Sequence, residues 1–429
     1  MKWRNQLLAL FCLLVFAGFG VVYFQHWVVQ KPFGIVLFIG EGLEPGRLAA
    51  TRVYAAGADS RLALDTLEHV ALVRNYSNDF ATPDSAAAAT AIATGVKVNN
   101  RTIGVDIEGK PLANVIELAR ERGRATGLIT NANLTDATSA AFYSHTANQE
   151  DREEIARALV EGGKIDIVFG GGGADFLPNT KGGRRNDQRD LLLEMQRNGF
   201  DLVRSKAELE AIPLWRRPKL FGVFSPTELA FTDQVEARSE QPSLADMVRR
   251  AIELLQFNPG GYLLVIDSGL MRKAAQENNG ERALAETIEL DRALATARRY
   301  IGGKSTVIVA GDTAIGGMNL NGFPFRKDTG VALLGFNFAG DPWLTWATGP
   351  NGTRSYGAAK LANENAPGPS ANSPVPTTQG QLQEPAAFFT GSAENTVDDM
   401  IALGTGRGAE ALHGSIDSTQ LFEIVRDDL

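Results

Sequence analysis

The sequence is poor in cysteine, in histidine and in clustered basic residues. Its only cysteine, Cys12, lies in an apolar N-terminal stretch, so the remainder of the chain cannot form a disulfide. The net charge is −8, and no run of lysine and arginine is interleaved with aromatic residues, which disfavours nucleic acid as a partner. Four histidines in 429 residues leave few nitrogen donors for a metal ion.

What is present is enough apolar sequence for a large core. The chain is 44% hydrophobic, and strand-like apolar runs alternate with helical patterns. This alternation predicts an α/β fold, a mostly parallel central sheet between two layers of helices. The predicted strands are 35–39, 126–130, 165–169, 262–266 and 306–310. A helix opened by Pro242-Ser243 and a second one over 281–300 are also predicted.

The first 30 residues differ from the rest. Lys2 and Arg4 precede an apolar run over 7–24, and 18 to 23 residues at ~1.5 Å each can cross a bilayer core. We predict a transmembrane signal anchor over 1–30, with its basic end inside and the globular part, 31–429, outside the cytoplasm. A cleaved signal peptide is the alternative, although Gly18-Phe19-Gly20 is a poor cleavage site.

The most informative stretch is TPDSAAAATAIATGVK, residues 82–97. Asp84-Ser85 stands at the head of a run of small residues that readily forms a helix. A serine hydroxyl there meets unpaired backbone N–H groups and a partial positive charge, which suit a phosphate oxygen. The alternative is an ordinary helix cap on an alanine-rich helix. Upstream, the apolar run FGIVLFIGEG ends in Glu41, where open α/β sheets place their ligands.

These motifs resemble the alkaline phosphatase family. The resemblance covers nearly everything after residue 32, and the ordered series implies one domain with insertions. In this family the nucleophile would be Ser85, and the substrate a phosphate monoester. The motifs that carry the resemblance are, in order, IGEG, TRVYAAG, PDSAAAATAIATGVK, NRTIGVD, TNANLTDATSAAFYSH, IDIVFGGGGADF, PSLADMVRRAIELL, GYLLVIDSG, STVIVAGDT and IALGTGRGAEALHGSIDSTQLF.

The resemblance also implies two zinc ions and one magnesium ion, but the zinc ligands look degenerate. Two consecutive ligand positions hold Arg272 and Gln276, and Thr313 replaces a histidine. The last histidine of the family aligns with Asn395, and the arginine that clamps phosphate is Gln149. None of the four histidines falls on a zinc position of the family. Zinc is therefore expected of the family but largely unsupported in this chain.

The oxygen ligands are kept. The resemblance places magnesium on Glu41, Asp136, Thr138 and Asp267, with Asp312 nearby. Such hard donors suit Mg²⁺, Mn²⁺ or Ca²⁺. The sequence predicts one oxygen-lined cation site that is retained although the ligands of the two zinc ions are lost. The alternative is that these carboxylates are leftovers, neutralised by a neighbouring cation or by hydrogen bonds.

Two functions follow. In the first, Ser85 hydrolyses phosphate monoesters slowly with a residual cation, and Arg272 binds phosphate in place of zinc. In the second, the chain is an inactive pseudophosphatase that binds an anion or a partner protein, and Arg272 is only ion-paired. The family resemblance also implies a homodimer.

Two further stretches have low complexity. Residues 351–394 are rich in Asn, Pro, Ser, Gly and Gln, and we predict a flexible insertion there, either a mobile flap or a solvent-exposed linker. Gly170 to Gly173 lacks the spacing and the lysine of a phosphate loop, so a tight turn after a strand is the preferred interpretation.

Overall fold

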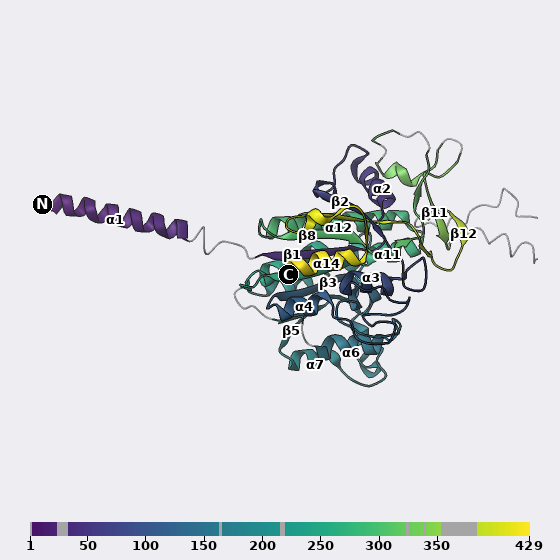
Figure 1. The fold of residues 1–429 in the computed structure, drawn as a ribbon, viewed down its shortest axis with the longest axis horizontal. Helices are drawn as coiled ribbons and strands as arrows, with labels where there is room; N and C mark the ends of the chain where they lie inside the picture. Colours follow the sequence, from purple (N-terminus) through teal and green to yellow (C-terminus); the bar gives the residue numbers. More distant parts are fainter. Residues whose placement is uncertain are drawn as a thin grey trace, which may run out of the picture.

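The computed structural model describes residues 2–23, 33–162, 165–214, 219–322, 326–328, 330–337, 340–352 and 384–429. Helix α1 (Lys2–Tyr23) extends away from the globular part, and its side chains are exposed over residues 3–21 (Figure 1). Within the described residues it is the one helix long and apolar enough to cross a membrane, and a signal sequence has the same properties.

A ten-stranded sheet forms the centre of the globular part (Figure 1). Its strands are β1 (Gly34–Gly40), β2 (His69–Arg74), β3 (Ala125–Asn133), β4 (Ile167–Gly171), β5 (Phe200–Val203), β6 (Lys219–Val223), β7 (Tyr262–Ser268), β8 (Thr306–Gly311), β14 (Met400–Thr405) and β15 (His413–Asp417). They follow the order β15-β2-β14-β8-β1-β7-β3-β4-β6-β5. Only β14 in this sheet is antiparallel to its neighbours, β2 and β8. The prediction of a mostly parallel sheet is confirmed.

The central strands are apolar along their length because both of their faces are covered. Every residue of β1, β7 and β8 is buried. Strand β1 lies in register between the other two, so that Gly40 faces Ser268 on one side and Gly311 on the other. At the start of this strand a Cβ on Gly34 would fall 2.3 Å from the Tyr262 ring, which explains the glycine. The register brings the carboxyl ends of three strands to one edge.

Helices cover both faces of the sheet, as a three-layer fold requires. One core contains residues of α3 (Ser85–Thr94), α4 (Val115–Glu121), α6 (Arg152–Gly162), α7 (Leu191–Arg197) and α14 (Thr419–Asp428). The opposite core contains residues of α2 (Pro45–Ala56), α8 (Lys206–Ala211), α10 (Leu244–Leu255) and α12 (Gly280–Tyr300). Helix α10 begins with a capping box in which Ser243 and Asp246 bond each other's backbone N–H groups, so the predicted start is confirmed. The three-layer α/β/α prediction is confirmed as well.

A smaller layer lies beside the carboxyl edge. It contains α11 (Leu270–Gln276), a sheet of β10 (Asn319–Leu320), β11 (Leu344–Gly349) and β12 (Ala386–Phe389), and the pair β9 (Ala314–Ile315) and β13 (Asn395–Thr396). Short helices α5 (Ala137–Ala140) and α9 (Val235–Arg238) complete the described helices.

The predicted insertion over 351–394 is only partly testable. Residues 353–383 lie outside the described residues. At the far end of the stretch, 386–389 form β12 and pair in parallel with β11. The Glu384 side chain, just before this strand, is buried and accepts a hydrogen bond from the Gly280 N–H at 2.6 Å. The composition of this stretch suggested a loop. The pairing of β12 with β11 and the hydrogen bond from Gly280 to Glu384 instead fix the position of its last residues.

Candidate active site

The predicted site residues gather at the carboxyl edge of the sheet. Glu41 follows β1, Asp267 lies near the end of β7, and Asp312 follows β8. These three strands are adjacent and in register. Because parallel strands end at the same edge, their terminal carboxylates come together there, as ligand sites of open α/β sheets do.

Ser85 is the first residue of α3, and Asp84 is its N-cap. The Asp84 carboxylate accepts hydrogen bonds from the backbone N–H groups of Ala87 at 2.9 Å and Arg101 at 2.6 Å. It also accepts one from the Gln149 side-chain amide at 3.1 Å. The Ser85 hydroxyl is fully buried and has no hydrogen-bond partner among the described residues. The start of α3 is thus held by several hydrogen bonds, while the Ser85 hydroxyl stays unpaired among the described residues.

Two of the carboxylates carry oxygens without a hydrogen bond. Asp267 Oδ2 accepts hydrogen bonds from Thr130 Oγ1 at 2.9 Å and Ser139 Oγ at 2.8 Å, whereas its Oδ1 has no partner in the described structure. Glu41 Oε2 is also without a hydrogen bond there, and Arg272 Nη1 lies 3.6 Å from it. Buried polar atoms are rarely left unpaired, so these two oxygens are candidates for binding a ligand.

Asp312 is the best-bonded of the three carboxylates. Its Oδ1 accepts from the backbone N–H groups of Gly42 at 3.2 Å and Thr313 at 2.6 Å. Its Oδ2 lies 3.4 Å from Thr138 Oγ1, the donor that the sequence places in the cation site. The structure therefore brings together Asp312 and Thr138 beside Glu41 and Asp267.

Burial makes this carboxylate cluster hard to ionise. It raises the pKa of the Glu41 carboxyl, and the Arg272 guanidinium acts in the opposite direction. Burial raises the pKa of Asp267 well above its ordinary value, and the Glu41 charge adds to the shift. Burial and the same charge raise the pKa of Asp312 to about 7. One guanidinium is too little positive charge for three buried carboxylates.

Asp136 has different partners from the other predicted ligands. Arg152 Nη2 lies 2.8 Å from its Oδ1, and Lys273 Nζ lies 3.2 Å from its Oδ2. Although burial acts to raise it, the pKa of Asp136 is lowered, because Lys273 and Arg152 stabilise the charged form. The structure thus directs Asp136 toward two cations that the sequence analysis did not single out.

Arg272 and Gln276 lie one turn apart on α11 and line two pockets. The first has a volume of about 220 Å³ and is also lined by Glu41, Asp136 and Gln149. The second has a volume of about 490 Å³ and extends past the Asp84 end of α3. Ser85 lines neither pocket, since its side chain is covered. Arg272 therefore stands between the open space and the carboxylate cluster.

Thr313 and Asn395, which stand where the resemblance places two further zinc ligands, both contact the Pro83 carbonyl oxygen. Thr313 Oγ1 lies 3.3 Å from the Pro83 carbonyl oxygen, and Asn395 Nδ2 donates to the same oxygen at 2.9 Å. Pairing of β13 with β9 sets Asn395 opposite Ile315 and fixes its place. Both side chains hold the backbone two residues before Ser85.

No histidine or cysteine, the donors that zinc prefers, lines the two pockets at Arg272. In the described parts of the chain no group of three or more His, Cys, Asp or Glu side chains is arranged to hold a metal ion of any kind, so magnesium at the carboxylate cluster would also require these side chains to move. His145 is bonded to the Gly104 carbonyl and to Glu117, and neither it, His69 nor His413 lines the two pockets at Arg272. His26 lies outside the described residues. The oxygen donors at the cluster suit a harder cation.

Sequence reasoning missed several neighbours of the site. Thr130 and Ser139 belong to the motif TNANLTDATSAAFYSH, and their hydroxyls could have been suspected from it. Lys273 follows Arg272 directly, but nothing in the sequence shows that its ammonium reaches Asp136.

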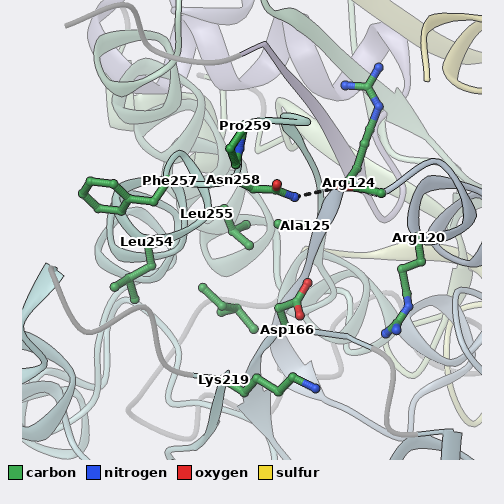
Figure 2. Close-up of a pocket in the computed structure, with 12 residues that line it drawn as sticks. Arg120, Arg124, Ala125, Asp166, Lys219, Leu254, Leu255, Phe257, Asn258 and Pro259 are labelled. Atoms are coloured by element: carbon green, nitrogen blue, oxygen red, sulfur yellow. Dashed lines mark hydrogen bonds between the residues drawn. The ribbon is translucent and has the colours of Figure 1, made fainter. Parts of the chain in front are cut away.

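A further described pocket, of about 430 Å³, lies far from this chemistry (Figure 2). It opens beside Ala125, Ile167 and Lys219, the first residues of β3, β4 and β6, at the amino edge of the sheet. None of the predicted site residues lines it.

Comparison with known proteins gives a consistent result. Residues 34–428 match the family model described as alkaline phosphatase. The chain is 29% identical to the tissue-nonspecific alkaline phosphatase of Gallus gallus over 66% of this chain and 64% of that protein, just under two thirds of the relative's length. It is 31% identical to alkaline phosphatase H of Pseudomonas aeruginosa over 66% of this chain and 70% of that one. A structure of a TAB5 alkaline phosphatase variant with magnesium bound in its M3 site has a TM-score of 0.69 at 20% identity. It covers 93% of this chain and 98% of the other, a likeness of fold. TAB5 is an Antarctic bacterium.

Proposed function

Because the chain belongs to the alkaline phosphatase family, we propose that it hydrolyses phosphate monoesters slowly, with Ser85 as the nucleophile. One observation carries the proposal. The Ser85 hydroxyl is buried at the N-terminus of α3 without a partner in the described structure. Leaving a buried hydroxyl unpaired costs about 1–3 kcal/mol, and a phosphoryl oxygen bound at this position would supply the hydrogen-bond partner.

The covalent steps balance without a further reactant. Ser85 Oγ forms a bond to phosphorus while the ester oxygen departs and takes up the proton that the serine loses. Water then attacks the phosphoserine, releases inorganic phosphate and restores the hydroxyl. Asp84, fixed by two backbone N–H groups and by Gln149, holds the start of α3 through both steps. Arg272 binds the phosphoryl oxygens with its planar pair of N–H donors.

A magnesium-like cation fits the carboxylate cluster better than zinc. Glu41, Thr138, Asp267 and Asp312 would hold it, and the unbonded oxygens of Glu41 and Asp267 support this assignment. Asp136, the remaining ligand expected from the sequence, would join only by giving up Lys273 or Arg152. When bound, the cation supplies electrostatic stabilisation of developing negative charge.

The rate is expected to be low because a guanidinium replaces zinc. Arg272 can stabilise an anion, but its pKa is too high for it to generate hydroxide from water as zinc does. Substrate also has to displace Arg272 from Glu41 before it reaches the covered serine. Both requirements reduce turnover while leaving phosphate binding intact.

A second function, a non-catalytic protein that binds an anion or a partner protein, has its own support. Ser85 lines neither pocket at Arg272, and the 3.6 Å ion pair between Arg272 and Glu41 neutralises part of the site without any metal. In this case phosphate binds at Arg272 and no ester is cleaved.

The experiment is the release of nitrophenol from p-nitrophenyl phosphate at alkaline pH with added Mg²⁺, Mn²⁺ or Zn²⁺. Wild type is compared with Ser85→Ala and with the matched control Ser144→Ala, since Ser144 is likewise buried with an unpartnered hydroxyl. If the chain is a hydrolase, wild type and Ser144→Ala release nitrophenol and Ser85→Ala does not. Equal background rates in all three proteins favour the binding protein.

We also propose that α1 is an uncleaved anchor, with Lys2 and Arg4 in the cytoplasm and the globular part outside it. Resistance to extraction by alkaline carbonate supports the anchor, and a mature N-terminus beyond residue 20 contradicts it. Homodimerisation, which the family resemblance implies, is tested by light scattering of the detergent-solubilised chain.

A further inference from the structure

The pocket at the amino edge of the sheet has a distinctive set of charges. Arg120 comes from the end of α4 and Lys219 from the start of β6, and both extend toward Asp166 (Figure 2). Neither cation forms an ion pair with any described residue. Asp166 Oδ2 accepts a hydrogen bond from the Thr126 N–H at 2.9 Å, which fixes the carboxylate in the pocket. The Lys219 ammonium also lies 5.5 Å from the centre of the Phe200 ring, and both cations line the pocket that holds the anchored Asp166 carboxylate.

The third cation of the pocket has other partners. Arg124 donates through Nε to the terminal Leu429 carbonyl oxygen at 2.8 Å and through Nη2 to the Asp428 carbonyl oxygen at 3.0 Å. Its guanidinium points away from Asp166 in Figure 2. Arg124 is therefore occupied by hydrogen bonds to the carbonyl oxygens of Asp428 and Leu429 and is not available to a ligand in the pocket.

The opposite wall is apolar. Leu254, Leu255 and Pro259 border the pocket from the end of α10 and the turn that follows it. In Figure 2 the two leucines face the space in front of Asp166. A ligand that matches both walls carries a phosphate for the two cations, an ammonium for the carboxylate and an apolar part beside them.

Chain connectivity places this edge near the membrane if α1 spans it. Strand β1 starts at Gly34 on the same edge, and the Arg124 guanidinium stacks over the Phe33 ring at 5.0 Å. Ten peptide units separate Tyr23, at the end of α1, from Phe33, and an extended chain covers at most about 36 Å in that length. The Ser85 site lies on the opposite edge.

We propose that this pocket binds the phosphoethanolamine headgroup of a bilayer lipid. The phosphate lies between Arg120 and Lys219, the primary ammonium is bonded to Asp166, and the glycerol and first methylenes run along Leu254 and Leu255. The contact holds the globular part on the bilayer with its Ser85 edge facing away. This inference rests on the proposed anchor but not on catalysis.

The test titrates the full-length protein, in maltoside micelles, with short-chain lipids by calorimetry. The probes are dihexanoyl phosphatidylethanolamine, dihexanoyl phosphatidylglycerol, dihexanoyl phosphatidylcholine and sodium phosphate. We expect the ethanolamine lipid to bind about tenfold more tightly than the other two lipids. Its ammonium can form a charge-assisted hydrogen bond to Asp166, whereas the glycerol headgroup offers only neutral hydroxyl donors and the choline headgroup offers none. Free phosphate, which lacks the ammonium and the apolar part, is expected to bind most weakly.

Single substitutions distinguish the residues proposed to bind the ammonium from those proposed to bind the phosphate. Asp166→Asn keeps the acceptor for the Thr126 N–H and should reduce the preference for ethanolamine over glycerol lipid to within about twofold. Arg120→Ala and Lys219→Ala should each weaken binding of all three lipids by about fivefold or more. Lys110→Ala, in an exposed turn, is the matched control and should behave as wild type.

Two results overturn the proposal. One is equal binding of the ethanolamine and glycerol lipids by wild type. The other is unchanged binding in both Arg120→Ala and Lys219→Ala. Because the titration involves neither phosphate release nor carbonate extraction, its failure is distinguishable from failure of the proposed hydrolysis or of the proposed anchor.

Discussion

Replacing Arg272 by alanine should change the affinities for magnesium and for phosphate in opposite directions. In the ligand-free site the guanidinium lies 3.6 Å from Glu41, one of the proposed magnesium ligands. Arg272 therefore competes with the cation for the same carboxylate. It is also the cation proposed to bind phosphate, so the same substitution removes a phosphate ligand.

The distance sets the size of the effect. At an effective dielectric constant of 20, two unit charges 3.6 Å apart attract each other by about 4–5 kcal/mol. The Arg272 side chain is 27% exposed, so water reduces this attraction. We expect about 1–3 kcal/mol to remain, which corresponds to a gain of roughly 5–150-fold in magnesium affinity for Arg272→Ala. Phosphate affinity should fall by a similar factor.

The same competition couples the two ligands in the wild-type protein. Phosphate draws Arg272 away from Glu41, so magnesium should bind more tightly when phosphate is present, and the reverse should hold by the same factor. Titration calorimetry of wild type, Arg272→Ala and the exposed control Arg292→Ala measures both affinities and their coupling. Unchanged magnesium affinity in Arg272→Ala, or coupling that survives in it, would refute this account of the site.

Three further predictions concern the fold. Burial raises the pKa of Glu384 to about 7. The stability that this residue contributes is therefore lost as the pH rises from about 4.5 through 7. When urea midpoints are measured across this pH range, Glu384→Gln should show a smaller change with pH than wild type. Ser243→Ala removes the hydroxyl that caps α10 and should cost about 1 kcal/mol in the same denaturation assay. Gly95→Ala should cost more than about 1 kcal/mol, because Gly95 has φ +74° and a Cβ there would lie 2.5 Å from the Phe422 ring; an unchanged melting temperature would contradict this.

The buried central strands of the sheet were predictable from the sequence, whereas the strands at the periphery of the fold were not. Five apolar runs predicted strands that the structure confirms, because strands covered on both faces are continuous apolar segments. Strand β2 alternates between buried and exposed residues, so its sequence is less continuously apolar than that of the central strands. Strand β12 was missed because it follows a stretch poor in apolar residues, and it is fixed by its pairing with β11. Such pairing depends on distant segments that local composition does not reveal.

The same division applies to the site. The family resemblance predicted that Glu41, Asp267 and Asp312 lie together, and the structure brings them together because their three strands are adjacent and end at one edge. The partners of Asp136 were not predictable, because Lys273 lies 137 positions further along the chain and approaches from another element. Asn395 is 312 residues from Pro83, and only the pairing of β13 with β9 fixes its position. The sequence therefore pointed to the carboxylates and to Arg272, but not to Lys273 and Arg152 beside Asp136.

The charges of the cluster are consistent with the proposal of one divalent cation, and in its absence protonation of the acids would balance them instead. Three carboxylates, Glu41, Asp267 and Asp312, are buried together and carry up to three negative charges when ionised. Arg272 supplies one positive charge, and the raised pKa values show that this is insufficient to keep all three ionised. A single divalent cation supplies the other two and leaves the cluster neutral. A second divalent ion would need two more buried negative charges, and the family positions that could provide ligands are here an arginine, a glutamine, a threonine and an asparagine. The proposed cation and the Arg272 guanidinium would together balance the charges of Glu41, Asp267 and Asp312.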